Sequence, residues 1–140
     1  MQFTTEQNKA IVTRFNKEFI EQGNMNSFKE IVADNVINHS APVGTPNGPD
    51  SMIYFIIEIL RKGFPDIQVE ILDQICEEDK VTTRKVMKAT HTGEFMGISV
   101  SNTSVTINVI DIIRLKMGNM LSIGELVILP ILFKNIITYV

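Results

Sequence analysis

Apolar residues follow a helical spacing before Pro65 and a strand spacing after it. Recurrence every third or fourth residue is typical of an amphipathic helix, and strict alternation is typical of a strand with one buried face. We therefore expect three helices in the first part of the chain, at residues 5–22, at a short stretch ending near Ala33, and from Asp50 or Ser51 to Gly63. Four strands should follow, at residues 66–76, 81–92, 103–116 and 119–129.

Polar residues able to cap a helix precede each predicted helix. They are Thr4 with Gln7, Ser27 with Glu30, and Asp50 or Ser51. Such a residue accepts a hydrogen bond from an N–H group of the first turn. Helices followed by a meander of strands predict an α+β domain with a curved antiparallel sheet. About three helices laid against one face of this sheet would enclose a cone-shaped pocket, which is a natural small-molecule site.

Composition narrows the function classes. The 140 residues suit a single domain over residues 1–140, and 44% hydrophobic with 21% charged residues is ordinary for a globular fold. The net charge is -3 and Lys and Arg form no block. We expect no nucleic acid partner, because such binding needs a concentrated positive field.

Signals for metal, disulfide and membrane are weak. Cys76 is the single cysteine, and no Cys/His cluster has zinc spacing, so we expect neither a disulfide nor a metal site. The N-terminus lacks the apolar run of a secretory signal. The apolar tail LVILPILFKNIITYV is broken by Pro130 and Lys134 and is too short to cross a bilayer. We expect a cytoplasmic protein without a membrane partner, whose tail packs in the core or against a partner.

Five short motifs occur in an order that resembles a known family. They are INHSAPVGTPNGPD, GFPDIQVEI, EEDKVTTR, THTGEFMGI and VIDIIRLKMGN. With Arg84 placed seven residues before His91, they resemble the SnoaL-like polyketide cyclase (ester cyclase) family over residues 5–121. The resemblance implies the nuclear transport factor 2-like cone, no cofactor, and commonly a homodimer formed through the sheet.

The resemblance also implies a reaction, which is ring closure by intramolecular aldol chemistry. In most relatives a pocket acid, typically Asp, follows a Glu-His-Trp-like run on the strand after the glycine turn. This chain has Ser-Ile-Gly at residues 122–124 instead, Ile128 lies near the acid position, and no Asp follows Asp111. The usual pocket acid is therefore predicted to be absent.

Glu125 is the one ionisable residue between residues 118 and 129. On a regular strand it shares a face with Ile123 and Val127, opposite to that of Ile128. We therefore expect Glu125 to point away from the family's acid position. A bulge, for which Gly124 offers an opportunity, would turn Glu125 into the pocket as a ligand-binding group.

Two histidines are candidate site residues. His39 ends the segment VINHS, which the resemblance places at the pocket mouth. Its neutral imidazole would act as a catalytic base or orient a ligand carbonyl, or would be satisfied by loop backbone. His91 would bind the ligand, or THTG would shape the turn around Phe95 that Gly93 and Gly97 favour.

Arg84 and Asp111 are the remaining candidates. Arg84 would pin a ligand carbonyl, enolate or carboxylate, or would pair with an acid such as Glu70 or Asp111. Alternation lets either Arg84 or His91 line the cavity, and both only with a bulge. Asp111 lies in an apolar strand, so it must be paired or protonated. It would act as a catalytic base with a raised pKa, or pair with Arg84 or Arg114.

Three functions remain open on this sequence. The first is a cofactor-free cyclase, isomerase or hydrolase with a degenerate catalytic strand. The second is a non-catalytic protein that binds a small apolar or weakly polar molecule. The third is an association module in which a dimer covers the apolar tail. These functions do not exclude one another.

Overall fold

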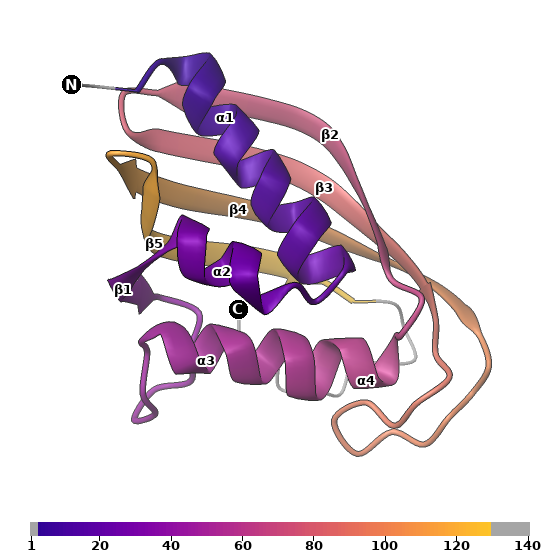
Figure 1. The fold of residues 1–140 in the computed structure, drawn as a ribbon. Coiled ribbons are helices and arrows are strands. Elements are labelled where there is room, and N and C mark those ends of the chain that lie inside the picture. Colours follow the sequence, from indigo (N-terminus) through magenta and orange to yellow (C-terminus); the bar gives the residue numbers. More distant parts are fainter. Residues whose placement is uncertain (1–2, 130–140) are drawn as a thin grey trace.

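The computed structural model describes residues 3–129 and places three helical segments on one face of a curved sheet (Figure 1). The first segment is α1 (Thr5–Arg14) with the π-helical turns η1 (Phe15–Glu21), and the second is α2 (Met25–Ile31). The third runs through α3 (Pro49–Ile53), the π-helical turns η2 (Tyr54–Leu60) and α4 (Arg61–Gly63). The three predicted helices are confirmed.

Five strands form the sheet in the order β1-β5-β4-β3-β2. They are β1 (Val32–Asn38), β2 (Gln68–Glu77), β3 (Lys80–Thr90), β4 (Ser104–Lys116) and β5 (Asn119–Ile128). Strands β2 to β5 pair antiparallel, as expected, and β1 adds a parallel edge beside β5. The α+β class is confirmed, and the sheet is mixed because β1, which lies between α2 and α3 in the chain, pairs parallel with β5.

The helix caps are only partly as predicted. Thr4 and Gln7 form the expected capping box, with each side chain accepting a hydrogen bond from the other residue's backbone N–H group. The prediction for Ser27 is wrong, since Asn24 caps α2. The Ser27 hydroxyl instead donates to Glu18 of the first helical segment. That bond joins the first two helical segments.

The core lies between the helices and the inner face of the sheet. Along β4 every second side chain is buried, and these are Val105, Ile107, Val109, Asp111, Ile113 and Leu115. The rings of Phe15, Phe19 and Phe28 pack in a row on the helical side, with centroids 5.5 and 4.6 Å apart. This alternation makes the inner face of β4 apolar except for the Asp111 carboxyl group in its middle.

A β-bulge next to the β4–β5 turn changes the face that β5 presents. Leu115 pairs with Met120, but Arg114 pairs with Ser122, so Leu121 is an extra residue without a partner in β4. Beyond the bulge Asp111 lies directly opposite Glu125. The expectation that Glu125 points away from the pocket is therefore wrong, because a bulge at Leu121 rather than at Gly124 shifts the register by one residue.

A glycine contact fixes the loop between β3 and β4. The Gly93 N–H group donates to the Gly63 carbonyl over 3.1 Å, and Phe95 and Ile98 exchange two backbone hydrogen bonds. The Phe95 ring packs on Phe64 with centroids 5.0 Å apart. The predicted turn around Phe95 is confirmed, and it brings Phe95 to the end of the third helical segment.

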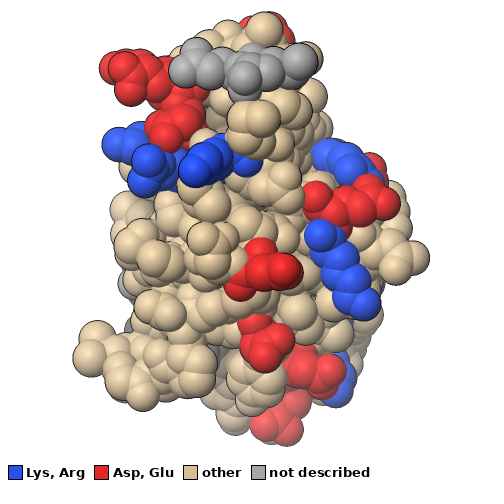
Figure 2. All heavy atoms as spheres, turned by 60° about the vertical axis from the view of Figure 1, so that its left-hand side comes forward, with Lys and Arg blue, Asp and Glu red and all other residues tan. Residues whose placement is uncertain are grey.

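The charged side chains do not form one large patch on the face shown in Figure 2. On the face shown in Figure 2, acidic and basic side chains lie in small groups separated by uncharged surface. Within residues 3–129 no helix is both long and apolar enough to span a membrane. The expectation for the apolar tail concerns mainly residues 130–140, which lie outside the described residues.

We predict that Gly93→Ala lowers the free energy of unfolding by about 2–4 kcal/mol, because a clash with backbone forces the loop to move. A Cβ atom at Gly93 would lie 1.9 Å from the Lys62 carbonyl oxygen. Urea denaturation measures the effect. Gly48→Ala is the control, since its Cβ atom meets open space and should cost less than about 0.5 kcal/mol. Equal stability of the two variants would contradict this packing.

Candidate functional site

A cavity of about 330 Å³ lies between the inner face of the sheet and the third helical segment. Its walls are mainly apolar, and they include Phe55, Met87, Ile107, Val109, Ile123 and Val127. The loop after β1 covers another side with Ala41, Pro42, Thr45 and Pro46. This composition suits a small, mostly apolar ligand with few polar groups.

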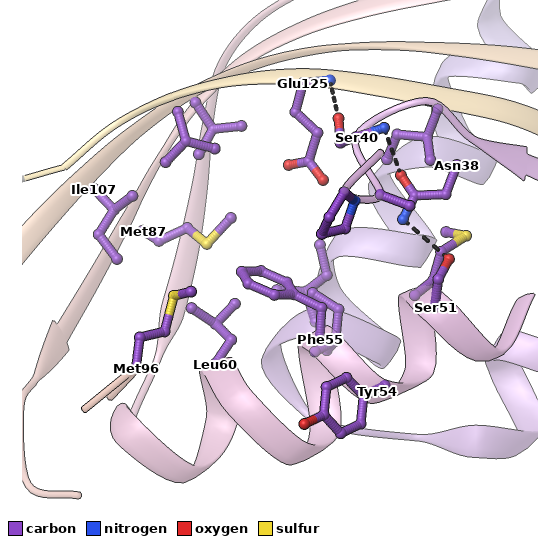
Figure 3. Close-up of a pocket in the computed structure, with 18 of the residues that line it drawn as sticks. Asn38, Ser40, Ser51, Tyr54, Phe55, Leu60, Met87, Met96, Ile107 and Glu125 are labelled. Atoms are coloured by element: carbon purple, nitrogen blue, oxygen red, sulfur yellow. Dashed lines mark hydrogen bonds between the residues drawn. The ribbon is translucent and has the colours of Figure 1, made fainter. Parts of the chain in front are cut away.

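Glu125 brings a carboxyl group into this apolar space. Figure 3 shows its side chain pointing from β5 into the cavity. The Glu125 N–H group donates to the Ser40 hydroxyl oxygen over 2.9 Å. The Ser40 N–H group donates to Asn38 Oδ1, and Asn38 Nδ2 donates to Ser51 Oγ. These bonds tie β5, the loop after β1 and helix α3 together around the carboxyl group.

A buried ion pair lies beside Glu125 on the inner face of the sheet. Lys85 Nζ is 2.8 Å from Asp111 Oδ2, and the two side chains are 1% and 0% exposed. Lys85 Nζ also donates to Asn16 Oδ1 over 2.6 Å, and Asn16 Nδ2 donates to the Val12 carbonyl over 2.9 Å. Lys85 lines the cavity together with Glu125. The ammonium group is therefore held by two strands and the first helical segment.

The surroundings of Glu125 raise the pKa of its carboxyl group to about 7. Burial is the largest cause, because an apolar environment disfavours the charged form. The positive charge of Lys85 lowers the pKa, and the negative charge of Asp111 raises it. A carboxyl group with a pKa near neutrality can both accept and donate a proton at physiological pH.

Arg84 lies outside the cavity. It is on the outer face of β3, where its Nη2 atom is 2.6 Å from Asp73 Oδ2 of β2. The alternative prediction, that Arg84 forms an ion pair with an acid on a neighbouring strand, is therefore confirmed. The partner is Asp73 rather than Glu70 or Asp111. The bulge between Ile71 and Asp73 brings the two side chains opposite each other.

Neither histidine lines the cavity. The His39 side chain is exposed at the loop after β1, while its neighbour Ser40 is buried and lines the cavity. His91 is fully buried, with its Nδ1 atom 2.8 Å from Ser101 Oγ and its ring beside Phe64. His91 thus lies in the loop between β3 and β4, as the structural alternative for THTG expected.

Asp111 is paired, as its position required, but with neither predicted arginine. Its partner is Lys85, whereas Arg114 pairs with Asp79 on the outer side. Lys85, Asn16 and Ser40 are site residues that the sequence analysis missed. The signal for Lys85 was its shared face with Val81, Thr83 and Met87. Among residues 3–129 no three His, Cys, Asp or Glu side chains are grouped to hold a metal ion.

Comparisons with known proteins agree with this architecture. The family model for the SnoaL-like polyketide cyclase matches residues 10–122. No match to the chain was found among curated protein sequences.

Solved structures show the same fold. AclR from Streptomyces galilaeus, a candidate hydroxylase, has a TM-score of 0.80 at 20% identity over 93% of this chain and 84% of that chain. IdmH from Streptomyces antibioticus, a candidate polyketide cyclase, has a TM-score of 0.75 at 20% identity over 86% of this chain and 91% of that chain. A candidate polyketide cyclase from Bacillus cereus has a TM-score of 0.73 at 26% identity over 86% of this chain and 74% of that chain. Since the family model covers most of the sequence, the chain belongs to the SnoaL-like polyketide cyclase family.

Proposed function

We propose that the protein moves a proton at a carbon atom next to a carbonyl group, in a small uncharged molecule, with Glu125 as the catalytic acid and base. The observation that carries this proposal is the Glu125 carboxyl group inside an apolar cavity, with a pKa of about 7. Membership of a polyketide cyclase family supports ring closure as the outcome. Isomerisation by the same proton transfer is the simpler variant.

Each step of ring closure conserves atoms. The Glu125 carboxylate removes the proton, and the electron pair moves onto the carbonyl oxygen to give an enolate. The enolate carbon forms a bond to a second carbonyl carbon of the same molecule. The resulting alkoxide takes the proton back from Glu125, so the product is an isomer of the substrate and no co-reactant is consumed. The Ser40 oxygen already accepts from the Glu125 N–H group, which leaves the Ser40 hydroxyl hydrogen for the enolate oxygen.

The charges of the cavity wall favour an uncharged substrate. Among the described residues of this wall Lys85 is the cation, and Asp111 balances its charge. Asp50 and Glu125 add carboxyl groups to the same lining. An anionic ligand would therefore lose its water without gaining a spare positive charge.

A non-catalytic binding protein is the second candidate. The predominantly apolar wall supports it, because most of the lining residues would contribute by burying the apolar surface of a ligand. The two candidates differ at Glu125, which a binding protein needs only for orientation of the ligand.

We also propose a homodimer formed through the outer face of the sheet. Aliphatic side chains are exposed on this face, namely Ile75, Ile110, Ile112, Leu126 and Ile128, with exposed fractions between 43% and 68%. Ile110 lies directly opposite Leu126 on the neighbouring strand, so part of the apolar surface is continuous. Exposed apolar patches of this kind support a protein interface. The free thiol of Cys76 is in keeping with a cytoplasmic location, which we propose as well.

We predict that the protein catalyses exchange of the α-protons of 2-tetralone, a small apolar ketone, in D₂O. Glu125→Gln should lower the rate by about 10²–10⁴-fold, because it removes the proton acceptor without changing shape. The wild-type rate should rise about tenfold per pH unit below pH 7 and level off above it, as Glu125 loses its proton. Proton NMR measures the exchange.

Glu77→Gln is the matched control, since Glu77 is an exposed carboxylate at the end of β2, and it should leave the exchange rate unchanged. Equal exchange by wild type and Glu125→Gln would contradict the catalytic role. A ketone that raises the melting temperature of the wild type without any exchange would favour the binding protein.

We predict that Ile110→Lys converts a dimer into a monomer, because it places a charge in the middle of the proposed interface. Light scattering coupled to size exclusion measures the mass. Val43→Lys changes a fully exposed residue in the loop after β1 and should leave the dimer intact. A wild-type protein that remains monomeric at high concentration would exclude this interface.

A further inference from the structure

We propose that Lys85 and Asp111 are positioning residues that set the protonation state of Glu125, so that the three groups act as one unit with a single exchangeable proton. This inference rests on the proposed role of Glu125 and adds two residues to it. The positioning residues act through Glu125 rather than by touching the reacting carbon.

Short contacts hold the two charged groups of the ion pair in place. Lys85 Nζ contacts Asp111 Oδ2 at 2.8 Å and Asn16 Oδ1 at 2.6 Å, and all three residues are at most 1% exposed. Asn16 is itself anchored through its hydrogen bond to the Val12 carbonyl. The ammonium group therefore has a defined place in the core, and little freedom to follow Glu125.

One ammonium group, on Lys85, faces two carboxyl groups, on Asp111 and Glu125, so one of the two carboxyl groups is left to bind and release a proton. Asp111 and Glu125 lie directly opposite each other on β4 and β5, on the inner face of the sheet. One ammonium group balances one of these two carboxylates, and a second carboxylate at a buried position is disfavoured. Because Lys85 contacts Asp111, Glu125 is the group left to gain and lose the proton.

Within residues 3–129, the cavity wall offers no other balancing positive charge. The other ionisable groups among the described residues of the cavity wall are Asp50 on α3 and Tyr54 on η2, and neither supplies a positive charge. His39 on the loop after β1 is exposed and outside the wall. Asp111 Oδ1 has no hydrogen-bond partner among residues 3–129. Burial and the Asp111 charge raise the pKa of Glu125, and Lys85 opposes them.

A purely structural ion pair would have different consequences. A buried ion pair contributes little net stability, and apolar residues of similar volume often replace it without loss. If Lys85 and Asp111 set the protonation state of Glu125, breaking the pair at one end should change the titration of Glu125 in a direction set by the charge removed. Removal of Asp111 leaves the Lys85 cation to Glu125 alone, and removal of Lys85 leaves two carboxyl groups without a cation.

The test is direct titration of Glu125 in the full chain by ¹³C NMR of its side-chain carboxyl carbon, assigned by its loss in Glu125→Gln. We expect a wild-type Glu125 midpoint near pH 7. Asp111→Asn should lower the Glu125 midpoint by at least about one pH unit. Lys85→Met should raise the Glu125 midpoint by at least about one pH unit. One unit is about a tenfold change in the carboxylate-to-acid ratio. The pH profile of ketone exchange should move with the midpoint.

Arg84→Met is the matched control. Arg84 is adjacent to Lys85 in the chain but pairs with Asp73 on the outer face, so its loss should leave the Glu125 midpoint unchanged. Equal midpoints in Asp111→Asn, Lys85→Met and wild type would overturn the inference. A wild-type Glu125 midpoint near 4.5 would also overturn it, and this result needs no variant to fold.

Failure of the proposed function would look different. In that case Glu125 would titrate near pH 7 and respond to both substitutions, but no ketone proton would exchange. Exchange that depends on Glu125, with midpoints that do not respond, would reject the positioning role alone.

Discussion

The pairing of β5 with β4 decides which side chains the cavity contains. Leu121 is inserted without a partner next to the turn, and beyond it Glu125 faces Asp111 across the two strands. In a hairpin without this extra residue, Gly124 would lie opposite Asp111, and Glu125 would point to the outer face that now carries Leu126 and Ile128. The one bulged residue therefore places the Glu125 carboxyl group on the face of β5 that lines the cavity, where aliphatic side chains would otherwise lie.

This placement makes the inner face of the sheet chemically unusual. Its middle holds Lys85 and Asp111 as a buried ion pair, and Glu125 points into the mainly apolar cavity beside them. Transfer of such groups from water into the core costs several kcal/mol per ion, and an ion pair recovers only part of that cost. Groups with pKa values shifted by burial and neighbouring charge are concentrated at functional sites. The raised pKa of Glu125 in this cluster supports the proposed proton transfer.

Hydrophobic spacing predicted the three helical segments, the four antiparallel strands and the fold class, since these elements are set largely by local periodicity and the β4 alternation is regular, but it did not predict the parallel edge strand β1. It failed at Leu121, because an aliphatic residue in an apolar strand carries no local mark of a bulge, and Gly124 offered a more familiar one. The requirement that Asp111 be paired was correct, but Lys85 was missed because β3 carries charges on both faces, Lys85 inside and Arg84 outside. Partners across strands depend on register, and register is not local information.

The register of β5 is also the point at which the account is most directly tested. Nuclear Overhauser effects in ¹³C- and ¹⁵N-labelled protein report which residues face each other across two strands. We expect cross-strand contacts between Asp111 and Glu125, and contacts from the Glu125 side chain to Val109 or Val127 on the cavity wall. Cross-strand contacts between Asp111 and Gly124, with the Glu125 side chain beside Ile110 on the outer face, would contradict it.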